Sequence, residues 1–129
     1  MSIQTQKQRI GSLGESIASK FLVKHGYKII ERNYRKKCGE IDIICKKDNL
    51  IHFIEVKTVS RETSSGEMAE NYRPEDNIHE EKLKRIGRTI ETYLIERETG
   101  LDWQFHAVLV FLYEKEKIAK IRLLADIII

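Results

Sequence analysis

The residues best suited to chemistry lie in two short runs, GEIDII and FIEVKT, which contain Asp42, Glu55 and Lys57. The first run belongs to a predicted strand over Glu40–Lys46, and the second to a predicted strand over Leu50–Lys57. Two carboxylates can hold a divalent cation, and a lysine two positions beyond one of them can reach whatever the cation holds. The three side chains therefore predict a metal-dependent site if the two strands bring them together.

The register of this hairpin decides whether the acids meet. The pair Asp48-Asn49 suits the positive φ angles of a two-residue type I′ turn, and with that turn the numbers of opposed residues add up to 97. Asp42 then lies opposite Glu55, and Glu40 opposite Lys57, with each pair pointing to one face. A shift of one residue would send Asp42 to the other face. We expect one face to carry Glu40, Asp42, Ile44, Phe53, Glu55 and Lys57, and the core face to carry Ile41, Ile43, Cys45, Ile54 and Val56, with His52 near the turn.

Two acids on one face of a sheet need compensation, because their Cα atoms would be about 5 Å apart. At an effective dielectric constant of ~20, two unit charges 4 Å apart interact by about 4 kcal/mol. A proton on one acid, a lysine or a cation can offset this repulsion, and Mg²⁺ accepts such oxygen ligands with waters completing its shell. A solvent-exposed polar sheet face is the alternative interpretation of the same residues.

A third acid, Glu15, lies in a predicted helix that begins at about residue 3 or 9 and ends at His25, before Gly26. Gly11 and Gly14 each cost about 1 kcal/mol relative to alanine in a helix interior. Their presence indicates that another backbone or a ligand comes close. Glu15 lies on the flank of the buried face, where a carboxylate needs a partner.

The remaining elements complete a mixed α/β pattern. A helix, a three-stranded meander, a loop, a helix and two strands indicate a mixed central β-sheet flanked by helices. A chain of 129 residues is expected to form one domain over residues 1–129. The further expected elements are a strand over Tyr27–Asn33, a polar connection over Arg35–Gly39, a flexible or functional loop over residues 60–77, a helix with Leu83, Ile86, Ile90 and Leu94 on its core side, a buried strand over Trp103–Tyr113 and a last strand over Lys117–Ile129.

Positive charge gathers in the first half of the chain. Residues 1–60 carry 12 Lys and Arg against 6 Asp and Glu, whereas residues 61–129 carry 11 against 14. The run Arg35, Lys36 and Lys37 lies in the basic half and is a candidate surface for a phosphate backbone. A solvated basic face is the alternative.

Composition narrows the class of protein. No stretch approaches the roughly 20 apolar residues that a membrane span requires, and residues 1–13 lack the apolar centre of a signal peptide. Cys38 and Cys45 are too few for a disulfide scaffold and lack zinc-site spacing. A cytoplasmic protein without a membrane partner is expected. The apolar residues Ile127–Ile129 could form an edge strand that pairs with a second copy.

Four motifs taken together resemble a known family. They are GxxGE ending at Glu15, then Asn33, then GEIDII, then FIEVKT. This pattern, over roughly Arg9–Phe111, resembles the YraN-like family of small bacterial proteins. That family is similar to the PD-(D/E)xK restriction-endonuclease-like superfamily and to archaeal Holliday junction resolvases. The resemblance implies a restriction-endonuclease-like core, a sheet flanked by helices.

The resemblance also implies roles for the site residues. Asp42 and Glu55 would hold Mg²⁺, or alternatively Mn²⁺, and the backbone carbonyl of Val56 would be a further ligand. Glu15 would complete the site from the first helix, directly or through a water molecule. Lys57 would orient the attacking water or stabilise charge on the phosphate.

Other matched positions concern the outer parts of the site. Lys82 and Arg85 occupy positions where the family is typically basic, and they are interpreted as phosphate contacts or as a solvated helix face. The chain departs from the family at Val59, where the family has arginine, and at Gln104 and His106, where it has arginine and aspartate. These departures remove no predicted metal ligand, and His106 is interpreted as replacing a structural hydrogen bond.

The combined prediction is a metal-dependent nuclease that hydrolyses phosphodiester bonds in DNA, with RNA as an alternative substrate and branched or junction DNA suggested by analogy. Positive charge from residues 1–60 would seat the strand through its phosphates. Two alternatives stay open: a catalytically silent nucleic-acid-binding module, and a scaffold whose acidic second half binds a protein partner.

Overall fold

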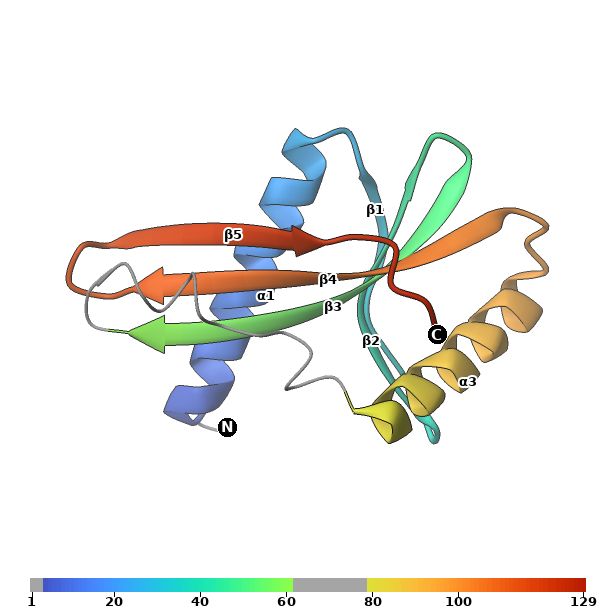
Figure 1. The fold of residues 1–129 in the computed structure, drawn as a ribbon, viewed down its shortest axis with the longest axis horizontal. Coiled ribbons are helices and arrows are strands. Elements are labelled where there is room, and N and C mark those ends of the chain that lie inside the picture. The colour runs from blue at the N-terminus through green and yellow to red at the C-terminus, as the bar shows by residue number, and fades with distance from the viewer. Residues whose placement is uncertain (1–3, 62–78) are drawn as a thin grey trace.

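The computed structural model describes residues 4–61 and 79–129 (Figure 1). Five strands form one sheet in the order β1-β2-β3-β4-β5, with β3 and β4 parallel and the other neighbours antiparallel. This arrangement confirms the predicted α/β class with a mixed sheet flanked by helices. The elements are α1 (Gln6–Lys24), β1 (Lys28–Lys36), β2 (Gly39–Lys47), β3 (Leu50–Arg61), α3 (Glu80–Arg97), β4 (Asp102–Tyr113) and β5 (Ile118–Leu124).

Each helix covers a different part of the apolar sheet surface. Residues of α1, including Ala18 and Leu22, share one cluster with Ile43 and Ile54, and α3 residues share another with Phe53. The prediction of a single core face was therefore wrong, because Ile44 and Phe53, assigned to the acidic face, are fully buried beneath α3. Ile41 joins that same cluster instead of the one with Ile43.

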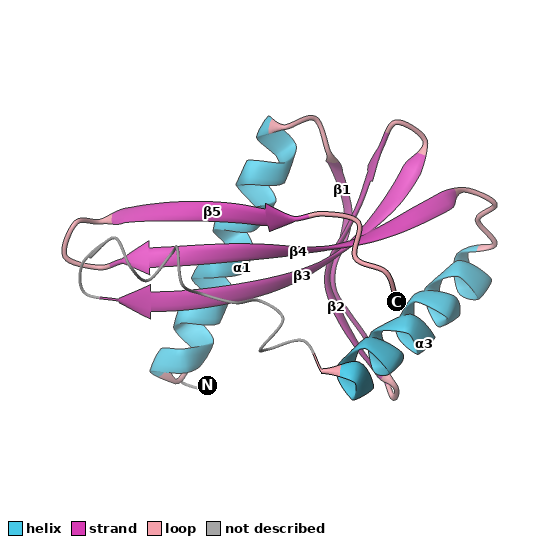
Figure 2. Ribbon diagram, viewed as in Figure 1, coloured by secondary structure: helices cyan, strands magenta, loops and turns pink. Residues whose placement is uncertain are grey.

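The hairpin between β2 and β3 follows the predicted register only as far as its middle. Asp48 and Asn49 have φ angles of 53° and 62°, as a type I′ turn requires. Five pairs with numbers adding up to 97 follow, ending at Ile43 opposite Ile54. Beyond this pair the two strands separate (Figure 2). The predicted extension of the ladder to Asp42–Glu55 and Glu40–Lys57 was therefore wrong, because β2 stays paired with β1 while β3 continues beside β4.

Several predicted element ends were also wrong. β1 extends to Lys36, so Arg35 and Lys36, predicted to belong to a polar connection, pair instead with Glu40 and Gly39 of β2. Ser60 and Arg61 belong to β3, and the rest of the predicted loop lies outside the described residues. The segment Ile127–Ile129 is not an edge strand, because the Ile127 amide donates to the Phe105 carbonyl at 2.8 Å and its side chain lies against the core. None of the described helices is both long and apolar enough to span a membrane.

Candidate metal and nucleic-acid site

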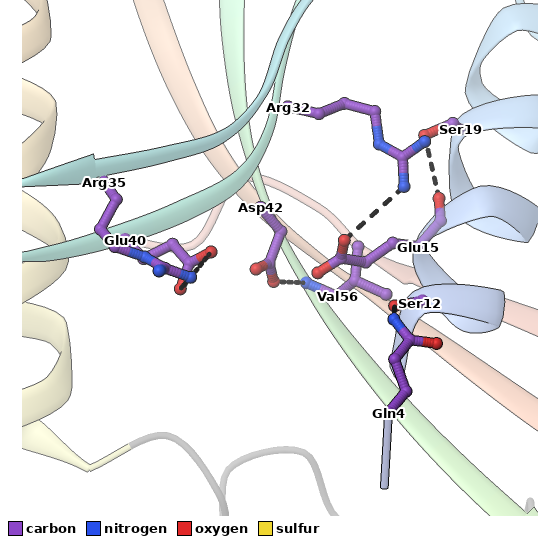
Figure 3. Close-up of polar contacts among 9 residues, drawn as sticks. All are labelled: Gln4, Ser12, Glu15, Ser19, Arg32, Arg35, Glu40, Asp42 and Val56. Carbon is purple, nitrogen blue, oxygen red and sulfur yellow. Dashed lines mark hydrogen bonds and ion pairs between the residues drawn. The ribbon is translucent and has the colours of Figure 1, made fainter. Parts of the chain in front are cut away.

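Asp42 lies at the point where β2 and β3 separate. Its carboxylate Oδ2 accepts a hydrogen bond from the backbone amide of Val56 at 2.7 Å, so the side chain supplies an acceptor where the ladder has ended (Figure 3). Burial, together with the charges of Glu55, Glu15 and Glu40, raises the pKa of Asp42 to about 8, against the effect of the Val56 hydrogen bond. The metal-free carboxyl thus holds a proton at neutral pH.

Glu15 approaches Asp42 from α1 because that helix lies unusually close to β3. A Cβ atom at Gly14 would lie 1.8 Å from Thr58 Oγ1, so only glycine permits this contact. At Gly11 no described atom lies within 4 Å of such a Cβ. The expected close approach is thus found at Gly14, whereas Gly11 borders open space. Glu15 forms an ion pair with Arg32 of β1 at 3.6 Å, and Figure 3 shows its carboxylate and that of Asp42 directed toward the same space.

Glu55 and Lys57 lie on β3, on the side opposite the α1 contact. The Glu55 carboxylate forms an ion pair with Lys82 of α3 at 2.7 Å, and its side chain is 18% exposed. Lys82, expected as a phosphate contact, is thus a direct partner of a predicted metal ligand. Lys57 is exposed.

One cavity of about 660 Å³ joins these residues, which come from α1, β2, β3 and α3. The structure therefore brings together the four side chains that the sequence selected, although Asp42 and Glu55 are not a ladder pair. Their chemical roles stay predictions. The cavity is lined by Gln6, Lys7, Ile10, Gly11, Glu15, Asp42, Glu55, Val56, Lys57, Thr58, Ser60 and Lys82.

Comparison with known proteins matches residues 14–110 of the chain to the uncharacterised protein family UPF0102. The chain belongs to this family. A UPF0102 protein of Campylobacter hominis is 39% identical over 114 residues, which are 88% of this chain and 91% of the relative. Another, of Caldicellulosiruptor bescii, is 34% identical over 119 residues, 92% of this chain and 96% of the relative. The YraN-like resemblance is thereby confirmed, and the matched span includes all four predicted site residues.

The acidic side chains of this UPF0102 protein have the chemistry that a hard divalent cation requires. In the described part of the chain, however, no three His, Cys, Asp or Glu side chains form a group arranged to hold a metal ion. Each acid instead has another partner: Asp42 the Val56 amide, Glu55 the Lys82 ammonium and Glu15 the Arg32 guanidinium. A cation that used Asp42 and Glu55 together would have to displace a proton from the first and Lys82 from the second.

Most of the basic residues predicted to bind nucleic acid have acidic partners. Arg35 contacts Glu40 at 3.3 Å across the β1–β2 pair. Lys36 contacts Glu96 of α3 at 2.7 Å, and Arg85 contacts Glu81 one turn away at 3.2 Å. Lys37 is exposed and has no ion-pair partner in the described ranges. These residues therefore do not form one unpaired cationic surface.

The sequence reasoning missed Lys7 and Arg32 as neighbours of the acids. Lys7 precedes Gly11 by four residues on α1, and residues four apart share a helix face. This spacing could have placed Lys7 on the same side of the helix as Gly11. Arg32 lies one residue before Asn33 on β1, and nothing in its spacing links it to Glu15. His106, expected to make a structural hydrogen bond, makes two, to His52 and to the Asp126 amide.

Proposed function

We propose that this protein is a Mg²⁺-dependent nuclease that hydrolyses phosphodiester bonds in DNA. The observation that supports this best is the raised pKa of Asp42, which reflects burial beside two further acids, Glu55 and Glu15, in one cavity. Three acids in one cavity repel one another and destabilise the fold. A bound cation would offset this repulsion, so the grouping favours a cation site over a purely structural role. Strongly perturbed carboxyl groups in a cavity are typical of functional sites.

The residues available to hold the cation are Asp42, Glu55 and the Val56 carbonyl, with Glu15 joining directly or through water. When bound, Mg²⁺ would polarise the scissile phosphate and lower the pKa of the attacking water. Mn²⁺ has the same preference for carboxylate and carbonyl oxygens and could replace it.

The chain's own side chains would orient the reactants. Lys57, exposed in the same cavity, donates a hydrogen bond to the attacking water and holds it for in-line attack on phosphorus. Lys82, once released from Glu55, donates to a non-bridging phosphate oxygen. Arg32 holds Glu15 toward the cavity from the far side. The oxygen of water bonds to phosphorus as its proton passes to solvent, and the P–O bond to the leaving strand breaks as the leaving oxygen takes up a proton from solvent.

The family resemblance favours DNA, and branched or junction DNA by analogy with the resolvases. Lys7, Lys57 and Lys82 border the cavity, so phosphates are the groups that they would attract. Binding of this kind is salt-dependent and largely independent of sequence.

The decisive experiment incubates the purified protein with junction, duplex and single-stranded DNA in the presence of Mg²⁺, Mn²⁺ or EDTA. We expect cleavage of at least one substrate that requires the metal and is lost in Asp42→Asn and Glu55→Gln. Glu91→Gln, which changes an exposed acid on α3 outside the cavity, is the matched control and should cleave normally.

The other outcomes separate the alternatives. Salt-sensitive DNA binding without cleavage under any metal would replace the nuclease by a silent nucleic-acid-binding module. No DNA binding at low salt would leave the protein-partner scaffold.

A further inference from the structure

A second cavity, also of about 660 Å³, meets the first at the acids. The two cavities share Gly11, Glu15 and Asp42. We call the first the cationic arm, because Lys7, Lys57 and Lys82 line it, and the second the amide arm. The amide arm is lined by Gln4, Gln8, Gly11, Ser12, Glu15, Asn33, Arg35, Glu40 and Asp42.

The junction between the arms lies at Gly11. No described atom lies within 4 Å of the position that a Cβ would take there, so nothing in the described chain fills this point. Each arm has the volume of a small-molecule site. A strand whose phosphate lay at Asp42 and Glu15 could therefore extend into both arms.

The arms differ in charge. Lys7 and Lys57 of the cationic arm have no ion-pair partner within residues 4–61 and 79–129, and both are exposed. Arg35, the one cation of the amide arm, is neutralised by Glu40 at 3.3 Å. These two lysines therefore favour a phosphate in the cationic arm over the amide arm. The cationic arm, however, is also lined by the acids Glu15, Asp42 and Glu55. The amide arm suits a neutral group with hydrogen-bond donors and acceptors.

Asn33 is the residue in the amide arm whose conformation needs an explanation. It lies inside β1 with a φ of 54°, in the left-handed region that non-glycine residues seldom adopt. Its neighbours pair as Arg32–Ile43 and Tyr34–Ile41, so Asn33 lies across from Asp42. Such strained residues cluster at functional sites. Asparagine tolerates this conformation better than most residues. Asn33 and Asp42 both line the amide arm.

We propose that the amide arm is a nucleotide subsite, in which Asn33 and Ser12 bind the base and sugar of the nucleotide next to the scissile phosphate. That the subsite lies next to the scissile phosphate rests on the proposed nuclease function. That its side chains bind a base and a sugar does not. A side-chain amide offers a donor and an acceptor together, which matches the polar edge of a base. The hydroxyl of Ser12 can donate to or accept from either a base or a sugar. Because nucleotides would occupy both arms, the bond between them is an internal one.

The first test needs no catalysis. Nuclear magnetic resonance of the labelled protein follows a titration with deoxyadenosine and deoxycytidine, which carry no phosphate, up to about 10 mM, where a millimolar site is more than half filled. A parallel titration uses inorganic phosphate. We expect the nucleosides to shift the amides of Gly11, Ser12 and Asn33, and phosphate to shift those of Lys57 and Thr58. Nucleoside shifts elsewhere, or none, would overturn the proposal.

A variant pair isolates the Asn33 side chain. Asn33→Gly keeps a residue that adopts positive φ freely but removes the amide. It should weaken nucleoside binding about fivefold or more, as the loss of a good base contact does. Asn49→Gly, at the β2–β3 turn, removes another asparagine of positive φ, at 62°, and should change nothing. Equal affinity in both variants would exclude Asn33 from the subsite.

A cleavage assay then separates this proposal from the nuclease proposal. Replacing one nucleotide at a time by an abasic unit in a single-stranded oligonucleotide should lower kcat/KM most beside the cleaved bond, and Asn33→Gly should remove that dependence. Cleavage that ignores abasic units overturns the subsite and leaves the nuclease. Nucleoside binding at Asn33 without cleavage under any metal overturns the nuclease and leaves the subsite.

Discussion

Two groups of titratable side chains differ in how the fold handles their charge: the partly buried acids around Asp42, and a buried pair of histidines. Burial, and then the charges of the acids around it, raise the pKa of Asp42 to about 8. The pair His52 and His106, on β3 and β4, is instead joined by a hydrogen bond of 2.8 Å. Both imidazoles are at least 95% buried, at exposed fractions of 5% and 3%.

The histidine pair satisfies all of its hydrogen-bonding groups. The Asp126 amide donates to His106 Nδ1 at 2.7 Å, so the ring proton of His106 is on Nε2 and is donated to His52 Nδ1. The other nitrogen of His52 donates to the Lys47 carbonyl at 3.3 Å. Both rings are thus neutral, and burial lowers the pKa of each. This pair is complete without a ligand, whereas an ionised Asp42 has no basic partner among the described residues and keeps a charge that a proton or a bound cation would remove.

The largest effect should come from Asp42→Asn, which removes the unfavourable charge. The pKa of Asp42 rises on folding from 3.8 to about 8, so the unfolded chain loses this proton first as pH rises. The native state therefore loses stability between about pH 4 and pH 8, by about 1.4 kcal/mol for each pKa unit. Asn keeps an acceptor for the Val56 amide and carries no charge. The variant should be more stable than wild type by several kcal/mol at pH 9.

Urea denaturation of the metal-free protein at pH 9 and pH 4 measures this difference. At pH 4 the free energies of unfolding of the two proteins should differ by less than about 1 kcal/mol, because Asp42 is then protonated in the folded state and nearly half protonated in the unfolded state. Asp102→Asn, at an exposed position on β4, is the control. If wild type proved the more stable at pH 9, the acids would be a structural network like the histidines.

A smaller effect of opposite sign is expected at the histidine pair. His106→Phe keeps a ring of similar size but leaves His52 Nδ1 and the Asp126 amide without their partner. Each buried group left unpaired costs about 1–3 kcal/mol. The variant should therefore be less stable than wild type at pH 8.

This loss should shrink as the pH falls. Because folding lowers the pKa of both histidines, the unfolded chain takes up protons below pH 6.5 that the native state resists. Stability of the wild type is then lost on acidification, whereas His106→Phe has one fewer group that titrates. Thermal unfolding at pH 8 and pH 5 provides the comparison. A destabilisation that stayed constant with pH would mean that lost packing, and not the neutral pair, is responsible.

The two groups also differ in how far the sequence predicts them. The turn Asp48-Asn49 and the alternation of β2 and β3 are local, so they fixed the first five pairs of the hairpin. The point of separation after Ile43–Ile54 is not local, because it depends on which neighbouring strand each strand follows and on the helix above it. The role of Asp42 stays a prediction, and its hydrogen bond to the Val56 amide was not foreseen.

Contacts between residues far apart in the sequence could not be predicted from the spacing of residues along the chain. Lys82 comes from a helix whose approach to Glu55 depends on how α3 lies against the sheet. His52 and His106 meet because β3 and β4 are parallel, with His52 opposite Gln104 and His106 opposite Ile54. His52 and His106 are 54 positions apart, and nothing in the sequence between them shows that the two strands are parallel or which of their residues lie side by side.

The smallest expected effect concerns the competition between Lys82 and a cation for Glu55. The ammonium of Lys82 is 2.7 Å from Glu55 Oε1, and the side chain of Lys82 is 41% exposed, so the pair is only partly shielded from solvent. Lys82→Met keeps most of the aliphatic chain and removes the charge. Glu55 is then free for a metal, and Mg²⁺ should bind severalfold more tightly, because a partly exposed ion pair contributes less than about 1 kcal/mol.

Isothermal titration calorimetry with Mg²⁺ at pH 9, where Asp42 is mostly ionised, measures this gain. Lys84→Met provides the matched control, since Lys84 pairs with Glu80 on the same helix and lies outside the cationic arm. Weaker Mg²⁺ binding in Lys82→Met would contradict the competition and would mean that Lys82 fixes Glu55 in the orientation that the metal needs. Unchanged binding would mean that Glu55 is not a ligand. This last result would reduce the contrast with the histidine pair, since Glu55 would then also have its final partner within the chain.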